Sequence, residues 1–256
     1  MVSDASTPRS RWITVTVFAL AVSVACVFLA RWQWDRLHAR EARNAVIVNN
    51  YDQPRAPLSS VVKPNTPLDG GVVWRRVETT GRYLTADEVL VRKRSLNEAT
   101  GYWVLTPLRT DRGSVLWCVR GWIRAGEDAR TPSAVPPAPT GTVVVTGHLR
   151  AAEGPSDDRG LPSGQVGRID SAALSQRVDS PTYDGWLQVT DEVPAPASAP
   201  TRLPAPEVSD GPHLGYAIQW GIFAIAAWVG WWVILRRAGE DDDDEEVQES
   251  YGSGSA

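Results

Sequence analysis

Two uninterrupted apolar stretches lie near the two ends of the chain, and a long polar segment separates them. The first covers residues 12–30 and the second residues 214–235, and neither contains a charged side chain. At helical rise, each stretch is long enough to cross the hydrocarbon core of a bilayer. The pattern therefore predicts two transmembrane helices that flank one water-exposed domain.

The first apolar stretch could also belong to a cleaved signal peptide, or to a lipoprotein signal at Cys26. It is longer than a usual signal core, however, and no small-x-small cleavage site stands near its end. Ser23 is a poor match to a lipoprotein signal, and apolar residues continue beyond Cys26. The sequence favours an uncleaved transmembrane helix.

Polar segments border this helix on both sides. Residues 1–11 are predicted to form a disordered tail, and residues 31–50 contain good helix formers with no breaker before Pro54. We interpret residues 31–50 as a helical extension whose Trp and Arg side chains lie at the membrane interface. His38, within it, is interpreted as a solvated helix residue.

Between residues 51 and 192 the pattern changes to short segments of period two, separated by turn residues. A loop rich in Pro, Ser, Asn and Gly, residues 53–71, comes first. The predicted strands are residues 72–83, 89–94, 103–110, 115–124 and 142–150, with weaker candidates at 166–169 and 186–190. Short strands at close spacing predict an extracytoplasmic β-rich domain, either an antiparallel barrel or a sandwich.

Local signals refine this β-rich domain. Residues 111–113 have the composition of a hairpin turn, and Asp170 can cap a short helix over residues 171–177. Gly81, Gly121 and Gly147 lie in or beside predicted strands. We interpret these glycines as bulges or bends that allow a sheet to close.

The C-terminal part has two further segments of biased composition. Residues 193–213 are rich in Pro and Ala and are predicted to be an extended connector to the second helix. Residues 236–256 contain a run of seven carboxylates followed by Gly and Ser, which predicts a disordered acidic tail.

Basic residues near the spans predict the orientation. Arg236 and Arg237 directly follow the second span, which places the C-terminus in the cytoplasm. With two spans the N-terminus is cytoplasmic as well. Four arginines after the first span oppose this assignment, but the rule weakens for long loops. We expect a multi-pass protein of the plasma membrane with an extracytoplasmic central domain.

Composition narrows the function classes. The net charge of −4 arises largely from the acidic tail, and no basic patch with interleaved aromatic residues indicates nucleic-acid binding. Cys26 and Cys118 lie in different predicted elements and are not expected to pair, and the only methionine is Met1. The chain therefore lacks the grouped soft ligands that copper handling requires.

The sequence contains no recognisable catalytic constellation. Its three histidines are widely spaced, and no zinc-protease, phosphate-loop or nucleophile-elbow motif occurs. His148 is interpreted as structural or exposed. Arg120 and Arg124 flank Trp122 and are interpreted as solvent-facing strand residues, with binding of a heme propionate or lipid phosphate as the alternative. We predict no catalytic residues and no enzymatic activity.

Four sequence blocks, in a fixed order along the chain, form a known pattern. They are LARWQ at 29–33 followed by Arg36; RVETTGRY at 76–83; GY at 101–102 with TPL at 106–108 and RGW at 120–122; and HLGY at 213–216 with Trp220. With its two spans around one domain, the chain resembles the SURF1 family of cytochrome c oxidase assembly proteins. Its Arg- and Ala-rich composition and acidic tail suit an actinobacterial member. Gly211-Pro212 stands where the family commonly has two asparagines.

The resemblance implies an assembly factor for an aa3-type cytochrome c oxidase that assists delivery or insertion of heme a, bound transiently, into the catalytic subunit. It implies oxidase subunits and heme a synthase as partners, in a lipid environment. His213, at the entrance of the second span, would be the heme iron ligand, with Tyr216, Trp220, Trp32 and Gln33 as further contacts. By position alone, His213 could instead be an interfacial residue that only solvates a helix N-terminus.

Two other functions stay open at this stage. The chain could be an accessory subunit that remains bound to a respiratory oxidase. It could also be a membrane-anchored enzyme acting on the cell envelope, although no nucleophile–base pair is recognisable in the sequence.

Overall fold

The computed structural model describes the backbone of residues 8–126 and 131–252, and the side chains of residues 12–126 and 131–237. It divides into a helical unit, Met1–Arg43 with Ser209–Ala256, and a β domain, Asn44–Val208. Residues 1–7 of the predicted N-terminal tail lie outside the described residues. The two apolar helices and the β-rich domain between them in sequence confirm the predicted fold class.

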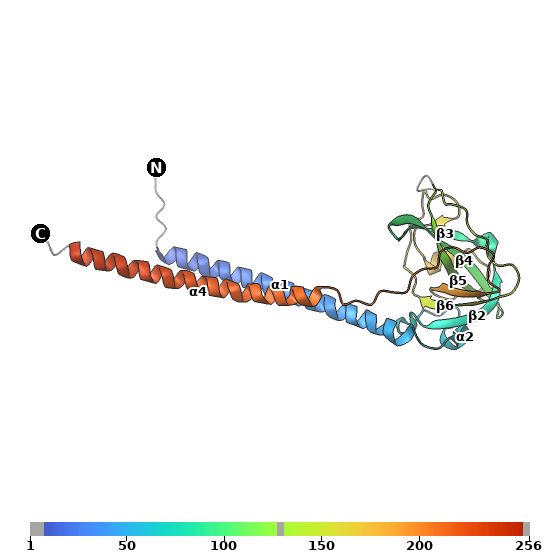
Figure 1. The fold of residues 1–256 in the computed structure, drawn as a ribbon, viewed down its shortest axis with the longest axis horizontal. Helices are drawn as coiled ribbons and strands as arrows, with labels where there is room; N and C mark the ends of the chain where they lie inside the picture. The colour runs from blue at the N-terminus through green and yellow to red at the C-terminus, as the bar shows by residue number, and fades with distance from the viewer. Residues whose placement is uncertain (1–7, 127–130, 253–256) are drawn as a thin grey trace. The chain divides into compact units, whose positions relative to one another are not determined.

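The helical unit consists of the long helices α1 (Pro8–Asn50) and α4 (His213–Gly252), shown in Figure 1. Pro8 suits the first helical position because its missing N–H would have no partner there. The segments Trp12–Asn50 and His213–Arg237 are long and apolar enough to cross a membrane. Large apolar side chains along them are exposed, for example Phe28 at 79% and Ile225 at 67%, as lipid-facing residues would be.

The acidic C-terminal segment differs from its prediction. Residues 236–256 were expected to be disordered, but α4 continues through the carboxylate run to Gly252. Extending an existing helix requires no new nucleus, so residues that would not start a helix can continue one. Beyond Arg237 the structure describes only the backbone of this helix, and residues 253–256 of the predicted tail lie outside the described residues.

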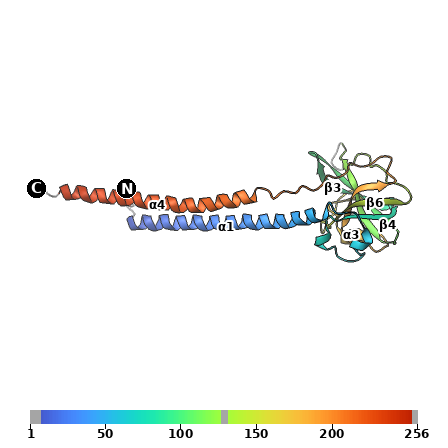
Figure 2. The same ribbon diagram turned by 60° about the horizontal axis from the view of Figure 1, so that its bottom comes forward.

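Among its described residues, the β domain contains eight strands, two short α-helices and two 3-10 turns. They are β1 (Ala56–Pro57), α2 (Leu58–Val61), η1 (Gly70–Val72), β2 (Arg76–Tyr83), η2 (Thr85–Asp87), β3 (Val89–Leu96), β4 (Ala99–Thr110), β5 (Val115–Arg124), β6 (Val143–Arg150), β7 (Gln165–Val166), α3 (Ser171–Ser175) and β8 (Trp186–Val193). The order β2–β6–β8–β5–β4 closes because β4 also pairs with β2, which makes a five-stranded barrel (Figures 1 and 2). Of the two predicted alternatives, the domain is a barrel.

The length of β4 allows this closure. Its first part pairs with β3 and its last residues pair with β2, while β5 runs along its other side. Gly81 of β2 stands at the junction, opposite Thr110 of β4 and Val143 of β6. A Cβ atom at Gly81 would come within 2.4 Å of the Arg109 carbonyl oxygen. Only glycine therefore permits the two strands to meet there.

The other two glycines accompany bulges, as predicted. The β4–β5 register shifts between Val104 and Leu105, which leaves Arg120 as the extra residue beside Gly121. The β6–β8 register shifts between Thr146 and Gly147. Both irregularities bend strands that form the barrel wall.

Strand β5 is buried on both faces. Leu116 and Cys118 belong to one apolar cluster, whereas Val115, Trp117 and Val119 belong to another. The second cluster is covered by Leu174 of α3. This two-sided burial explains why β5 is the most continuously apolar of the predicted strands.

The strong strand predictions and the hairpin at Gly113 are confirmed, with corrections at the ends. The predicted loop 53–71 contains β1, α2 and the start of η1. Strand β2 starts at Arg76 rather than at residue 72, because Trp74 adopts a positive φ of 68° that interrupts extended backbone. The side chain of Asp170 caps α3 by accepting from the N–H groups of Ala172 and Ala173.

The Pro- and Ala-rich connector is docked on the barrel over part of its length. Thr201 forms an antiparallel bridge with Trp122, and Arg202 donates to the carbonyl oxygen of Arg120 at 2.7 Å. The connector therefore contributes to the β domain before the chain reaches α4.

Candidate functional site

The buried face of α1 follows a repeat of three and four residues. It carries mostly small or polar side chains, namely Ala19, Ser23, Cys26, Gln33 and Leu37. Such spacing places residues on one side of a helix. Two pairs of small residues spaced four apart, Ala21 with Ala25 on α1 and Ala226 with Gly230 on α4, are exposed.

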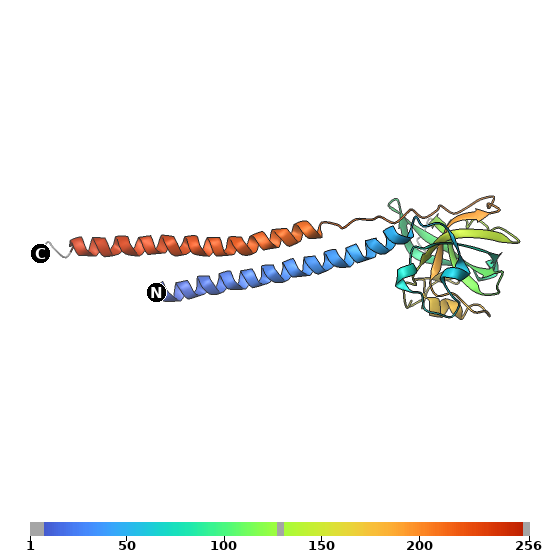
Figure 3. The ribbon, with the colours of Figure 1, turned by 90° about the horizontal axis from the view of Figure 1, so that it is seen from below.

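Side-chain hydrogen bonds join α1 to α4, which lie side by side in Figure 3. The indole N–H of Trp231 donates to the hydroxyl of Thr16 at 2.8 Å. At the other end, Nδ1 of His213 lies 2.8 Å from Oε1 of Gln33. These bonds fix an antiparallel register, in which early residues of α1 meet late residues of α4.

The protonation of His213 follows from this contact. An amide oxygen only accepts, so Nδ1 of His213 donates to Gln33. In the neutral imidazole, Nε2 then carries the lone pair. His213 is half-buried and is the first residue of α4.

The backbone before His213 makes a tight turn against α1. Gly211 has a φ of 67°, and a Cβ atom there would lie 2.8 Å from Nη1 of Arg40. The carbonyl of Pro212 accepts from the N–H of Tyr216, which continues the first helical turn. A side chain at Gly211 would therefore displace Arg40 as well as strain the turn.

The aromatic residues predicted for this site have exposed or half-buried rings. Trp32 is 49% exposed and Tyr216 is 46% exposed. The guanidinium of Arg36 lies 5.5 Å from the centre of the Trp32 ring, and Trp220 packs edge-on against Phe223. No hydrogen bond or ring contact joins Trp32 to His213 among the described side chains, since Trp32 lies one residue round the helix from Gln33.

Trp32 instead lines an apolar groove along α1, with a volume of about 550 Å³, together with Val27, Phe28, Leu29, Arg31 and Asp35. The structure thus brings Gln33 and His213 together and leaves the predicted aromatic residues as surface around them. Contact of any of these residues with heme stays a prediction.

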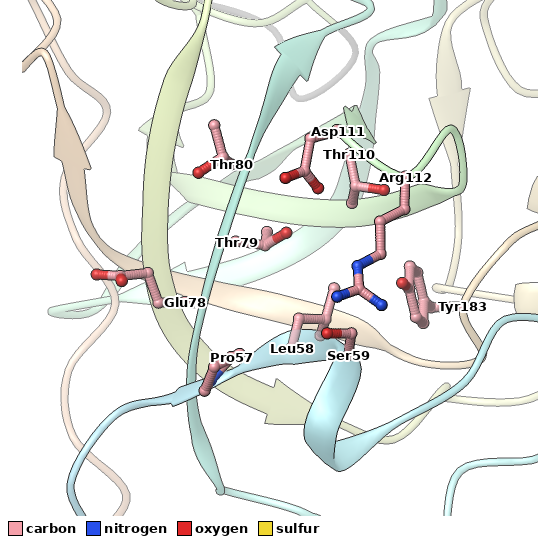
Figure 4. Close-up of a pocket in the computed structure, with 10 residues that line it drawn as sticks. All are labelled: Pro57, Leu58, Ser59, Glu78, Thr79, Thr80, Thr110, Asp111, Arg112 and Tyr183. Atoms are coloured by element: carbon pink, nitrogen blue, oxygen red, sulfur yellow. The ribbon is translucent and has the colours of Figure 1, made fainter.

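A polar pocket of about 200 Å³ lies in the β domain where α2, β2 and the β4–β5 hairpin meet (Figure 4). Figure 4 shows the guanidinium of Arg112 near Ser59 and the ring of Tyr183, and Thr79 and Asp111 also line the pocket. The sequence did not suggest this pocket, because its residues come from distant segments. Hydroxyl, guanidinium and carboxylate groups line it, and none of the lining side chains is a His, Cys or Lys that could serve as a base for a nucleophile.

A charged cluster is enclosed in the β domain, and it overturns both interpretations of Arg120. That side chain is 0% exposed; it pairs with Glu88 at 3.4 Å and donates to the carbonyls of Pro136 and Pro137 at 3.1 and 2.8 Å. Glu192, also fully buried, pairs with Arg202 at 2.6 Å. Arg120 therefore neither faces solvent nor is available to an external anion, because both of its terminal nitrogens donate to groups inside the domain.

Burial also determines protonation in this region. It raises the pKa of the Tyr83 phenol well above its usual value, and the hydroxyl donates to Glu192 at 2.8 Å. Burial likewise raises the pKa of the Cys118 thiol, so that this cysteine is neither a nucleophile nor a soft metal ligand. Both cysteines are free, as expected from the sequence.

His148 has a structural role. Its ring stacks on Tyr51 at 4.1 Å, and Nε2 lies 3.2 Å from the Tyr51 carbonyl oxygen. Burial lowers its pKa, and the nearby charges of Arg76 and Arg150 lower it further. Among the side chains of residues 12–126 and 131–237, no group of three or more His, Cys, Asp or Glu residues is arranged to hold a metal ion.

Comparison of the sequence with known proteins finds a matching family model and several related proteins. A model described as the SURF1 family matches residues 20–225. SURF1-like proteins of Mycobacterium bovis and Mycobacterium tuberculosis are 29% identical over 228 residues, which cover 87% of this chain and 82% of theirs. The cytochrome oxidase assembly protein SHY1 of Saccharomyces cerevisiae is 30% identical over 104 residues, or 40% of this chain and 26% of its own length.

Proposed function

The chain belongs to the SURF1 family, and on that basis we propose that it is an assembly factor for an aa3-type cytochrome c oxidase, assisting heme a delivery or insertion into the catalytic subunit. The coarse part of this proposal, oxidase assembly, is supported by the family and by the similarity to SHY1, whose name states that role. The finer part, heme a handling, is supported by the contact between Gln33 and His213.

The donor set of this contact fits a heme group better than a bare metal ion. His213 supplies one imidazole nitrogen, and the described residues offer no cluster of further ligands. A porphyrin brings four nitrogen ligands of its own, so that one axial histidine from the protein is sufficient. Heme a, when bound, would supply the iron and its redox chemistry.

The surroundings of His213 suit the faces of a porphyrin. Tyr216 and Trp32 offer exposed rings, and the site lies at the N-terminal end of an apolar span. Aromatic and apolar surface of this kind favours a large planar ligand. Gln33 holds the histidine, as outer-shell groups commonly hold metal-binding imidazoles.

Topology is part of the proposal. With both termini in the cytoplasm, the β domain and His213 lie on the outer side of the plasma membrane, and Arg236 and Arg237 lie on the inner side. A reporter fused after Arg237 is expected to be active in the cytoplasm, and cysteines introduced on exposed β-domain positions to react with a reagent added outside. Protection of those cysteines in intact cells would contradict this orientation.

The proposed partners are cytochrome c oxidase subunits and heme a synthase, within membrane lipid. A transient factor is present in less than one copy per oxidase, whereas an accessory subunit copurifies at about one. The proposed role is therefore non-enzymatic and also distinct from that of a permanent subunit. Stoichiometry of the copurified complex separates these two outcomes.

The decisive experiment concerns heme. The chain is produced in cells that make heme a and is purified with and without His213→Ala. A bound heme spectrum that disappears in the variant supports ligation by His213. Equal heme content in both proteins, or none in either, would contradict the proposal. Heme content of the oxidase from a deletion strain then tests delivery.

A further inference from the structure

We propose that Gln33 is a positioning residue that holds the imidazole of His213 in one tautomer, with Nδ1 protonated and Nε2 free to bind heme iron. The inference deepens the proposed function and rests on it. It assigns to Gln33 a role through His213 rather than a contact with heme.

The hydrogen bond itself carries the tautomer assignment. Nδ1 of His213 lies 2.8 Å from Oε1 of Gln33, a normal length for a directional N–H···O bond. The amide oxygen has no hydrogen to give, so the hydrogen lies on Nδ1. In the part of the chain that the structure describes, no hydrogen bond is made to Nε2 of His213.

The position of Gln33 makes the bond persistent. Gln33 is only 9% exposed, and a buried amide left without a hydrogen-bond partner destabilises the folded state. Leu37 continues the same buried face of α1, and Arg40 lies against Gly211 just before His213. Both sides of the contact are therefore restrained, one by helix packing and the other by the turn into α4.

The other two histidines lack this arrangement. Nε2 of His148 lies 3.2 Å from a carbonyl oxygen, and its Nδ1 is buried without a partner. His38 bonds the carbonyl of Trp34 on its own helix and is exposed. Among the three histidines, His213 alone is held by a side chain from another helix. Its second nitrogen, unlike Nδ1 of His148, is not a buried atom that lacks a partner.

The test compares two substitutions at one residue with a matched control. Gln33→Leu removes the acceptor with little change in size, and Gln33→Glu keeps an acceptor oxygen. Thr16→Val removes a hydrogen bond between α1 and α4 at the far end of the pair, the bond that Trp231 donates to Thr16. The control thus loosens the same helix pair without touching His213.

The first readout needs no heme. The full chain is labelled with ¹⁵N-histidine, placed in lipid nanodiscs, and examined by NMR at a pH where the imidazoles are neutral, with His213→Ala for assignment. Wild type, Gln33→Glu and Thr16→Val are expected to show His213 protonated at Nδ1. Gln33→Leu is expected to show a mixture with the Nε2-protonated form. An Nε2-protonated wild type, or no change in Gln33→Leu, would overturn the inference.

The second readout is hemin titration of the same samples. Loss of an outer-shell partner typically weakens binding by about 10–100-fold, so we expect a fall of about tenfold for Gln33→Leu and affinities near wild type for Gln33→Glu and Thr16→Val. An equal loss of hemin affinity in Gln33→Leu and Thr16→Val would mean that Gln33 acts only through helix packing and does not position His213. Binding in wild type no stronger than in His213→Ala would refute the proposed function, while the NMR result still decides whether Gln33 sets the tautomer.

Discussion

Arg120 and Glu192 lie opposite each other inside the β domain, both fully enclosed, with Nε of the arginine 3.8 Å from Oε1 of the glutamate. Arg202 binds the second oxygen of the same carboxylate at 2.6 Å. Charges removed from water in this way are stable only while each has its partner. The cluster joins the bulge in β5, the end of β8 and the connector.

Replacing Arg120 is therefore expected to destabilise the β domain. Arg120→Met should lower the free energy of unfolding by about 3 kcal/mol, because it leaves Glu192 and Glu88 short of a cation and frees two proline carbonyls. Urea-dependent pulse proteolysis of the detergent-solubilised chain measures this change. Arg124→Met, at the exposed end of the same strand, is the control and should change stability by less than about 0.5 kcal/mol. Equal effects would mean that burial of Arg120 is not what matters.

Gly147 offers a test of barrel closure. A Cβ atom there would lie 2.3 Å from the carbonyl oxygen of Gln188, a backbone atom on the neighbouring strand. Gly147→Ala is expected to cost about 2–3 kcal/mol, because strands β6 and β8 must separate to accept the methyl group. Gly70→Ala, where nothing lies within 4 Å, is the matched control, and the same proteolysis assay applies. A stable Gly147→Ala protein would show that the strands adjust freely.

The stability of the β domain is expected to fall in mild acid through His148. Because burial lowers the pKa of this imidazole in the folded state, the unfolded chain takes up a proton more readily as the pH drops. The stability that the neutral His148 ring gives to the folded state is complete above the unfolded pKa of about 6.5. It is lost as the pH falls through the lower pKa of the folded state. Thermal melts of wild type between pH 8 and 5 should show this slope, and His148→Gln should reduce it. His38→Gln, which alters an exposed side chain in the helical unit, should leave the slope unchanged.

Trp32 is expected to matter more for oxidase assembly than Trp12. Both are tryptophans of α1, but Trp32 lines the apolar groove beside the turn that carries Gln33, whereas Trp12 lies at the opposite end of the span. Oxidase activity in membranes from cells with Trp32→Ala should be lower than with Trp12→Ala at equal protein level. Equal losses would indicate general anchoring at the membrane interface.

The carboxylate run is expected to be dispensable for insertion. Glu240 to Glu246 are consecutive like charges, which repel one another along a helix and give little net stability. A chain ending at Arg237 should therefore reach the membrane at the wild-type level, as judged by immunoblot of membrane fractions. A clear fall in level would mean that this end of α4 docks on another structure.

Local chemistry accounts for most of the correct sequence-based predictions. The strands were recognisable because period-two segments alternate with turn residues. Helix α3 was recognisable because Asp170 occupies a typical N-cap position before it. Gly81 and Gly147 were recognisable as bends because glycine inside a strand has few other reasons to occur. These signals depend on neighbours within a few residues.

The failures concern partners that are distant in sequence. Arg120 looked like a surface residue because Glu192 and the two proline carbonyls that satisfy it belong to other segments. In the helical unit, the sequence placed Trp32 and Gln33 at the right level of the span but could not say which of them faces His213. That choice depends on the direction in which each side chain leaves α1, which turns by about 100° from one residue to the next. The spacing of Ala19, Ser23 and Cys26 contained this information, since it continues to Gln33.

The docking of the connector has a consequence for synthesis. Thr201 and Arg202 complete the β domain, since one pairs with Trp122 and the other neutralises Glu192. The carbonyl oxygen of Pro204 then accepts a hydrogen bond from Gln188, and only residues 205–212 separate this contact from the start of α4. A growing chain can thus finish its barrel only when its second membrane helix is about to emerge, so completion of the domain and anchoring of the C-terminal end are nearly simultaneous events.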